Sequence, residues 1–298
     1  MPTPDRIAVA HYRSRRRIIA VVARAARQAW RQVDRADLSG SWRAMLPRLL
    51  VTVAGAQLAA ARQADEYLTA VLAAQGLDAD PDGSVQAVAL SGVASDGRSL
   101  DTLLTEPVIT TKLAISRGAT VPRAMAVGYT HLDMIARTQV ADAGRVADQV
   151  ALTARPAVTG YVRMVVGSTC SRCLILAGRR YEWNQGFQRH PNCDCIHIPA
   201  AEDTADDLRT NPRAAFDAMP PEEQDRVFGK AGAEAIRDGA DMARVVNARR
   251  GMYTAGGRLF THEAAGRRPR LMPEQILREA DGDRAEAIRL LRLHRYIL

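Results

Sequence analysis

Apolar residues recur at three- and four-residue spacing through most of the first half of the chain. This spacing predicts amphipathic helices over residues 12–35 and, after a break rich in Ser, Gly and Asp, over residues 42–75. Two more helices are predicted over residues 100–116 and 122–153. Between the two pairs, residues 76–97 are rich in Gly, Asp and Ser and are expected to form a loop. The first half is therefore predicted to be helical and elongated.

The pattern changes near residue 160, where short β-branched segments bounded by glycines replace the helical spacing. Residues 161–166, 180–183 and 195–199 are predicted strands, and residues 253–261 are a predicted hairpin centred on a Gly-Gly pair. The segments between and after them are predicted to be helical, with helix starts near Asp203, Pro212 and Pro220, one helix over residues 229–248 and a helical pair over residues 272–296. This second half therefore combines short strands with helices.

Together these patterns predict a mainly α protein with a small α+β module. We expect three parts: a helical domain with a basic N-terminal helix (residues 1–158), an α+β domain that contains all the cysteines (159–262) and a C-terminal helical extension (263–298). A length of 298 residues fits more than one domain. Aromatic residues make up only 5% of the chain, so the cores must depend on Ala, Val, Leu and Ile.

The positive charge of the chain is concentrated at one end. The formal net charge is +8, and the first 50 residues, with 11 arginines and three aspartates, hold all of that excess. Within the first predicted helix, one face carries a set of arginines that are our candidates for binding nucleic acid or a protein partner: Arg17, Arg24, Arg27, Arg31 and Arg35. Three interpretations stay open: a solvated helix face, docking on an acidic protein, and contact with nucleic-acid phosphates.

The sequence predicts neither a membrane span nor a secretory signal. The longest apolar stretch, residues 49–61, has 13 residues, whereas a spanning helix needs about 20. Arg24 and Arg27 interrupt the apolar run near the N-terminus. We therefore expect a protein made in a reducing cytoplasm, with no membrane and no small-molecule substrate among its partners.

All four cysteines lie close together and form two pairs. Cys170 and Cys173 form a Cys-x-x-Cys pair, and Cys193 and Cys195 follow a nearby histidine, His190. Four of these five side chains are predicted to hold a structural Zn²⁺, since paired thiolates on turns suit a tetrahedral ion. A redox-active pair, buried free thiols and disulfides formed outside the cell are the alternatives.

The cysteine region also carries a resemblance to a known family. It resembles the phage Mu protein F-like (MuF-like) minor head proteins of tailed phages, with looser similarity over residues 100–260. The family often has Arg where this chain has Asp194, and this difference weakens the argument that the position binds phosphate. The residues that match its signature are Cys170, Cys173, Leu176, Gly178, His190, Pro191, Cys193 and Cys195.

This resemblance implies a minor capsid protein for head morphogenesis, from a phage of a high-GC actinobacterium. Such a protein would lie in the virion, inside the capsid at the portal vertex. Its partners would be the portal protein or the major capsid protein, with packaged double-stranded DNA as a further candidate. The alternatives are a zinc-stapled DNA-binding or DNA-processing protein and a head-maturation protease. We expect no enzyme, because the sequence contains neither a Gly-x-Ser-x-Gly nor a His-Glu-x-x-His motif. His131 and His262, the histidines that the protease alternative would use, are expected to have surface, packing or local hydrogen-bonding roles.

Overall fold

The computed structural model describes residues 2–166, 169–185, 195–201, 210–263 and 269–297. The chain divides into two compact units. The first unit contains Met1–Arg163 and Arg180–Leu208, and the second contains Met164–Arg179 and Arg209–Leu298. These units divide the chain differently from the three predicted ranges, because the chain leaves the first unit at residue 163 and returns to it at residue 180.

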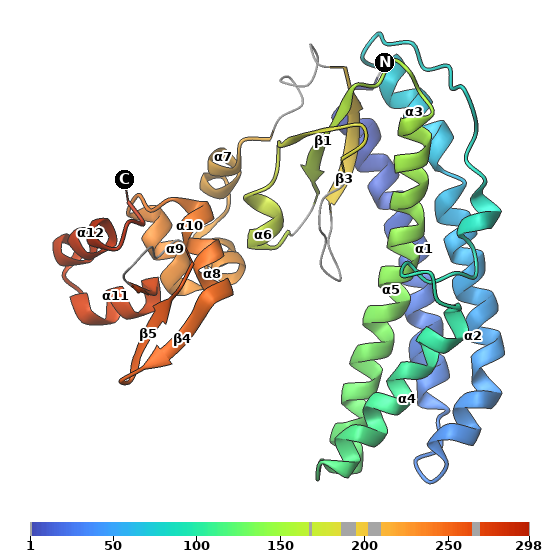
Figure 1. The fold of residues 1–298 in the computed structure, drawn as a ribbon, viewed down its shortest axis with the longest axis horizontal. Coiled ribbons are helices and arrows are strands. Elements are labelled where there is room, and N and C mark those ends of the chain that lie inside the picture. Colours follow the sequence, from blue (N-terminus) through green and yellow to red (C-terminus); the bar gives the residue numbers. More distant parts are fainter. Residues whose placement is uncertain (1, 167–168, 186–194, 202–209, 264–268, 298) are drawn as a thin grey trace. The chain divides into compact units, whose positions relative to one another are not determined.

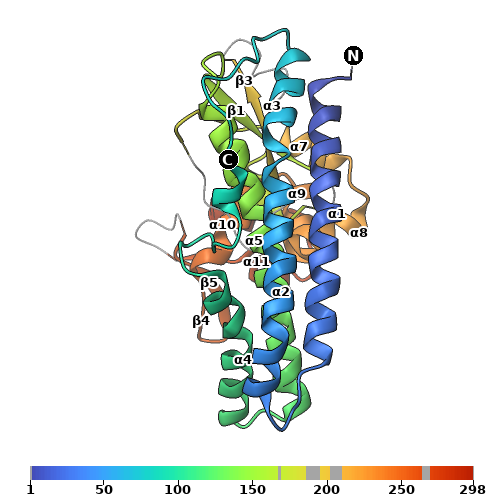
Figure 2. The ribbon, with the colours of Figure 1, turned by 90° about the vertical axis from the view of Figure 1, so that its right-hand side faces the viewer.

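The first unit is built around long helices, as the hydrophobic spacing predicted. Helices α1 (Pro4–Arg31), α2 (Leu38–Ala61), α4 (Leu100–Ser116) and α5 (Val121–Thr153) lie side by side with alternating direction (Figures 1 and 2). The helix predicted over residues 42–75 is interrupted, and α3 (Ala64–Ala73) continues beyond the break. The expected loop contains one turn of 3₁₀ helix, η1 (Ala87–Leu90).

Two tryptophans pack together in this helical core, near the end of α1 and the start of α2. Trp30 and Trp42 meet edge to face with their ring centroids 5.5 Å apart, and only 6% and 2% of their surfaces are exposed. Each indole N–H donates to a carbonyl oxygen, that of Met125 for Trp30 and that of Leu104 for Trp42, both at 3.0 Å. The two rings therefore fasten α1 and α2 to α5 and α4.

Gly128 on α5 is required by this packing. A Cβ atom at Gly128 would lie 2.6 Å from the Trp30 ring and 2.0 Å from Oγ1 of Thr111. We expect Gly128→Ala to destabilise the protein by about 1–3 kcal/mol, since overpacking displaces a rigid ring. Gly55 on α2 is the matched control: it is exposed with nothing within 4 Å of a built Cβ, so Gly55→Ala should stabilise by about 0.5–1 kcal/mol. Thermal melting of both variants checks that Gly128→Ala lowers the melting temperature and that Gly55→Ala raises it.

Two buried glutamines attach the long loop to the helices. Gln57 on α2 accepts from the N–H of Gly92 and donates to the carbonyl of Val93, both at 2.9 Å. Gln139 on α5 accepts from the N–H of Ser95 at 2.7 Å and donates to its hydroxyl at 3.0 Å. The loop is thus held by side chains in place of regular secondary structure.

A small sheet completes the first unit. Strands β1 (Gly160–Val165), β2 (Arg180–Glu182) and β3 (Cys195–Ala200) confirm the three predicted strands, in the order β2-β1-β3. Strands β1 and β2 are antiparallel, with Tyr161 opposite Tyr181. Every residue of β3 is buried, and this strand packs against α1, α3 and α5.

The second unit consists of short helices and one hairpin. The predicted helix over residues 229–248 is split at Gly239, whose φ of +98° ends it. Another helix predicted to start near Asp203 lies outside the described residues. The described elements are α6 (Ser171–Leu174), α7 (Pro212–Asp217), α8 (Pro221–Phe228), α9 (Lys230–Arg237), α10 (Met242–Ala248), η3 (Arg249–Gly251), β4 (Met252–Ala255), β5 (Arg258–Thr261), β6 (Arg270–Leu271), α11 (Pro273–Ala280) and α12 (Arg284–Leu293).

A buried arginine holds the C-terminal segment in the second unit. The Arg270 guanidinium lies 4.1 Å from the centre of the Tyr296 ring and donates to the carbonyl of His294 at 2.6 Å. The Tyr296 hydroxyl in turn donates to the carbonyl of Leu271 at 2.9 Å. Tyr296, which follows the last helix, is therefore part of the packed core, and Ile297 packs against it.

The apolar helical segment around residues 49–61 is longer than that stretch by itself. By length and composition alone, Leu38–Ala73 could cross a membrane, and 28% of its most apolar window is buried. Core helices of globular proteins pass the same test, and Trp42, Leu49 and Val53 of this segment belong to the core of the first unit. This finding is weak evidence for a span.

Candidate functional sites

The predicted arginine face of α1 is present in the structure, and it is longer than predicted. All five predicted arginines are exposed, and Arg6 and Arg13 extend the same face toward the N-terminus. We call Arg6, Arg13, Arg17, Arg24 and Arg31 the arginine stripe. They are spaced by seven or four residues, which keeps them on one side of a helix.

The charge of the stripe is not neutralised within the described residues. Asp5 is the only acidic residue of α1. No stripe arginine forms an ion pair with a described carboxylate. The other two predicted arginines differ in position: Arg27 donates to the Tyr129 hydroxyl at 3.0 Å, and Arg35 lies beyond the end of α1. The stripe can therefore attract a polyanion without first breaking an internal ion pair.

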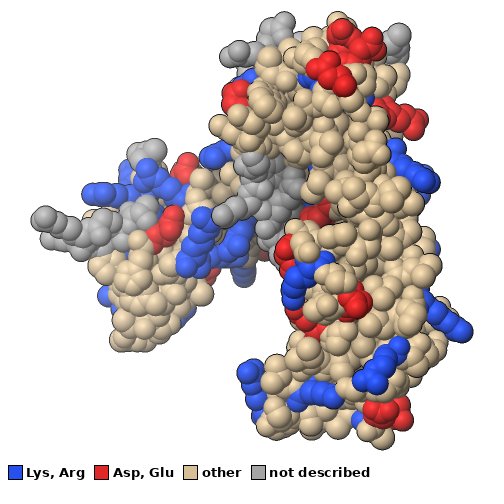
Figure 3. All heavy atoms as spheres, turned by 45° about the vertical axis from the view of Figure 1, so that its right-hand side comes forward, with Lys and Arg blue, Asp and Glu red and all other residues tan. Residues whose placement is uncertain are grey.

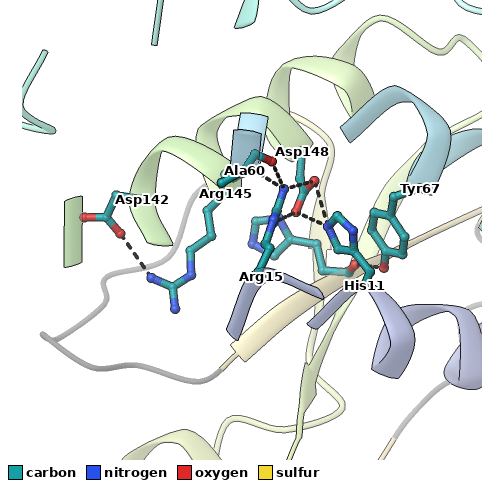
Figure 4. A network of polar contacts seen from close by, with 9 residues as sticks. His11, Arg15, Ala60, Tyr67, Asp142, Arg145 and Asp148 are labelled. Carbon is teal, nitrogen blue, oxygen red and sulfur yellow. Dashed lines mark hydrogen bonds and ion pairs between the residues drawn. The ribbon is translucent and has the colours of Figure 1, made fainter. Parts of the chain in front are cut away.

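The opposite side of α1 is fixed by a buried polar network (Figure 4). Arg15 forms a two-pronged ion pair with Asp148 of α5, and its Nη2 donates to the carboxylate at 2.8 Å and to the carbonyl of Gly144 at 2.7 Å. His11 lies one turn earlier, with Nε2 3.3 Å from the same carboxylate. Its ring stacks on Tyr67 of α3 at a centroid distance of 3.9 Å. The network joins α1, α3 and α5.

Burial sets the protonation of this network. Desolvation, helped by the Arg15 charge, lowers the pKa of His11, so the ring is neutral where it stacks on Tyr67. Burial alone would raise the pKa of Asp148, but Arg15 and His11 hold it below its usual range. Burial also raises the pKa of Tyr67. Near neutral pH the network therefore contains one cation and one anion.

These shifts predict a loss of stability on acidification. Between the lowered pKa of folded His11 and its ordinary value of 6.5, the unfolded chain binds more protons, so stability falls as the pH drops below about 6.5. Asp148 extends the loss below its ordinary pKa of 3.8. The variant His11→Phe keeps an aromatic ring on Tyr67 but has no group that titrates. Between pH 7.5 and pH 5 its melting temperature should fall less than that of the wild type. His294 also has a lowered pKa, through burial and Arg270, so the difference between variant and wild type isolates His11.

The cysteine cluster is only partly described. Cys170 caps the N-terminus of α6, where its Sγ accepts the N–H of Cys173 at 3.4 Å, and the Cys173 side chain is buried. Cys195 begins β3 in the first unit and accepts a hydrogen bond from Arg163 at 2.9 Å. His190 and Cys193 lie outside the described residues.

Three of the five predicted zinc ligands, Cys170, Cys173 and Cys195, lie among the described residues. Within the described part of the chain, no group of three or more His, Cys, Asp or Glu side chains is arranged to hold a metal ion. The Cys-x-x-Cys pair lies at the start of α6, with Cys170 as the N-cap residue. The zinc site stays a prediction about four of the five named side chains.

The two histidines considered for catalysis have local structural partners. Nδ1 of His131 lies 2.9 Å from the hydroxyl of Thr110 on the neighbouring helix. The ring of His262 stacks on Tyr253 of the hairpin at 4.2 Å. Both positions agree with the packing roles that the sequence favoured.

Sequence reasoning missed the residues that anchor the arginine face. Asp148 and Tyr67 are 133 and 56 positions away from Arg15 and His11, and no local motif links them. The one available signal was Arg15 itself, which falls on the apolar side of α1 together with Ile19 and Val22. A charged residue on a buried face requires a partner.

Comparison with known proteins assigns the chain to a family. A family model described as VG15 protein matches residues 2–220, which is most of the chain. No curated protein and no solved structure matches the chain. VG15 is a family of phage proteins and indicates a virion-associated protein, in agreement with the predicted phage origin. The helical unit with its exposed arginine stripe therefore belongs to a member of the VG15 protein family.

Proposed function

We propose that this chain is a minor capsid protein for head morphogenesis of a tailed phage, bound inside the head near the portal vertex. Membership of a phage family supports the virion part of this proposal. The resemblance of the cysteine region to MuF-like minor head proteins supports the minor-head part. Portal and major capsid proteins are the proposed assembly partners.

We also propose that the arginine stripe contacts packaged double-stranded DNA. The observation that carries this proposal is a row of five exposed arginines without carboxylate partners among the described residues. From Arg6 to Arg31 the row is about 38 Å long at 1.5 Å per residue. A row of that length lies within reach of several phosphates, and each neutralised phosphate releases counterions.

The first test is quantitative mass spectrometry of density-purified phage particles. We expect this chain at a low, fixed ratio to the major capsid protein in DNA-filled heads. Absence from particles, with the protein abundant only in infected cells, would contradict the minor-head proposal. It would favour the DNA-processing alternative.

The second test measures DNA affinity against salt. We expect the triple variant Arg13→Gln, Arg17→Gln and Arg24→Gln to reduce the slope of log affinity against log salt by about 2.7, or 0.9 per lost phosphate contact. Arg43, Arg48 and Arg62 are exposed arginines of α2 and its C-cap, and their triple Gln variant is the matched control. Equal slopes for both variants would exclude the stripe as the DNA contact.

We further propose that the cysteine cluster holds a structural Zn²⁺, with four ligands from Cys170, Cys173, Cys193, Cys195 and His190. The bound ion would cross-link a region of short strands that has little core of its own. Elemental analysis of the purified protein should give one zinc per chain, and Cys173→Ser should lose it. A metal-free protein with one reversible disulfide would favour the redox alternative.

A further inference from the structure

A groove in the first unit combines basic and apolar groups. It has a volume of about 460 Å³ and lies between the C-terminal end of α1, the turn that follows it, and the N-terminal part of α5. We call it the tip groove. It is lined by Arg27, Trp30, Arg31, Val33, Arg35, Met125, Ala126 and Tyr129.

The rim of the tip groove is positively charged. Arg27, Arg31 and Arg35 are exposed, and none of them forms an ion pair with a described carboxylate. The nearest acids in sequence, Asp34 and Asp37, accept the backbone N–H groups of Ala36 and Gly40 at 2.9 Å and form no ion pair with these arginines among the described residues. At the lower end of the helical unit, Figure 3 shows several Lys and Arg side chains together with a patch of Asp and Glu.

The floor of the tip groove is apolar and rigid. Trp30 and Val33 are buried core residues, and Met125 and Ala126 continue this surface on α5. Tyr129 orients one arginine, because its hydroxyl accepts the hydrogen bond of Arg27. A floor of this kind suits apolar side chains, while the rim suits carboxylates at the edges of the same ligand.

We propose that the tip groove binds a short segment of a partner protein in which acidic residues flank apolar ones. Apolar side chains of the segment enter the floor, and its carboxylates pair with Arg27, Arg31 and Arg35. The apolar groups of duplex DNA are held within the stacked duplex and cannot enter the floor as flexible side chains can, so charge and apolarity together favour a peptide. The volume lies within the range of about 300–1,000 Å³ that binding sites use. This proposal shares Arg31 with the arginine stripe, goes beyond DNA contact by the stripe and does not depend on it.

The test is selection from a random peptide library displayed on particles, with the full-length protein as the target. The selected peptides are then synthesised, and their affinities are measured by fluorescence anisotropy. We expect enriched peptides that place Asp or Glu beside Leu, Ile, Val or Phe. The triple variant Arg27→Gln, Arg31→Gln and Arg35→Gln should bind them about tenfold more weakly, as expected for three exposed charge pairs.

A control variant distinguishes binding in the tip groove from attraction of acidic peptides to positive charge anywhere on the protein. The α2 variant with Gln at Arg43, Arg48 and Arg62 removes the same charge and should bind the peptides like wild type. Ala126→Glu, an exposed substitution on the apolar floor, should abolish binding while the protein melts normally.

Three results would overturn the proposal. They are enriched peptides without acidic residues, equal binding by the groove and control variants, and a short DNA duplex that binds at the groove arginines and excludes all peptides. The last result would identify nucleic acid as the occupant. None of these results bears on whether the chain is a virion component.

Discussion

Asp148→Ala is expected to destabilise the protein by about 3–5 kcal/mol, because it leaves the buried Arg15 guanidinium without its counter-charge. The side chains of Arg15 and Asp148 are only 7% and 2% exposed, so water cannot replace the lost carboxylate. His11 loses its polar partner at the same time. Chemical denaturation followed by far-UV circular dichroism measures the loss.

Two controls make this prediction specific. Asp142→Ala removes from the same helix a carboxylate that is 23% exposed and pairs with the buried Arg145, and it should cost clearly less than Asp148→Ala because water reaches the Asp142 site. The double variant Arg15→Met with Asp148→Leu removes both charges and should recover most of the lost stability, since a buried pair can be replaced by apolar groups. Equal costs for Asp148→Ala and Asp142→Ala would show that the network is not what fixes α1.

Trp42→Ala should also cost about 3–5 kcal/mol, through the cavity that it leaves in the helical core. Trp42 is 2% exposed, packs edge to face on Trp30 and donates to the carbonyl of Leu104. Trp183 provides the matched control, because 44% of its surface is exposed and its backbone N–H and carbonyl form its hydrogen bonds to Thr159 and Gln149. Trp183→Ala should change the stability by less than about 0.5 kcal/mol.

Melting temperature and hydrogen exchange together test this second prediction. The loss for Trp42→Ala should include faster exchange of the α4 amides, because the indole fastens α2 to α4. A loss of stability without faster exchange in α4 would place the role of Trp42 elsewhere in the core.

The helices of the first unit could be predicted because each has a regular apolar stripe. The predicted bounds 100–116 agree with α4, and those of 122–153 differ from α5 by one residue. The first helix was predicted too short at its N-terminus, where Pro4 begins it, and the second was predicted without its interruption at residues 62–63. Alanine-rich segments carry little signal for such breaks, because alanine fits both a helix interior and its end.

The arginine face is the part of the candidate sites that sequence could predict. Helical spacing alone places Arg17, Arg24 and Arg31 on one side of α1, and their exposure follows from the apolar stripe on the other side. The tip groove could not be predicted in this way. Tyr129 is 102 positions from Arg27, and only the packing of α5 against α1 brings the phenol to the guanidinium.

By itself, the sequence determined which helices form and which side of the first helix is charged, since both follow from periodicity within a single segment. Tertiary structure alone decided that Arg15 is buried against Asp148, that Gly128 admits the Trp30 ring, and that three arginines border an apolar floor. Each of these depends on contacts between segments far apart in the chain. Their geometry is set by how whole helices pack, which local spacing does not encode.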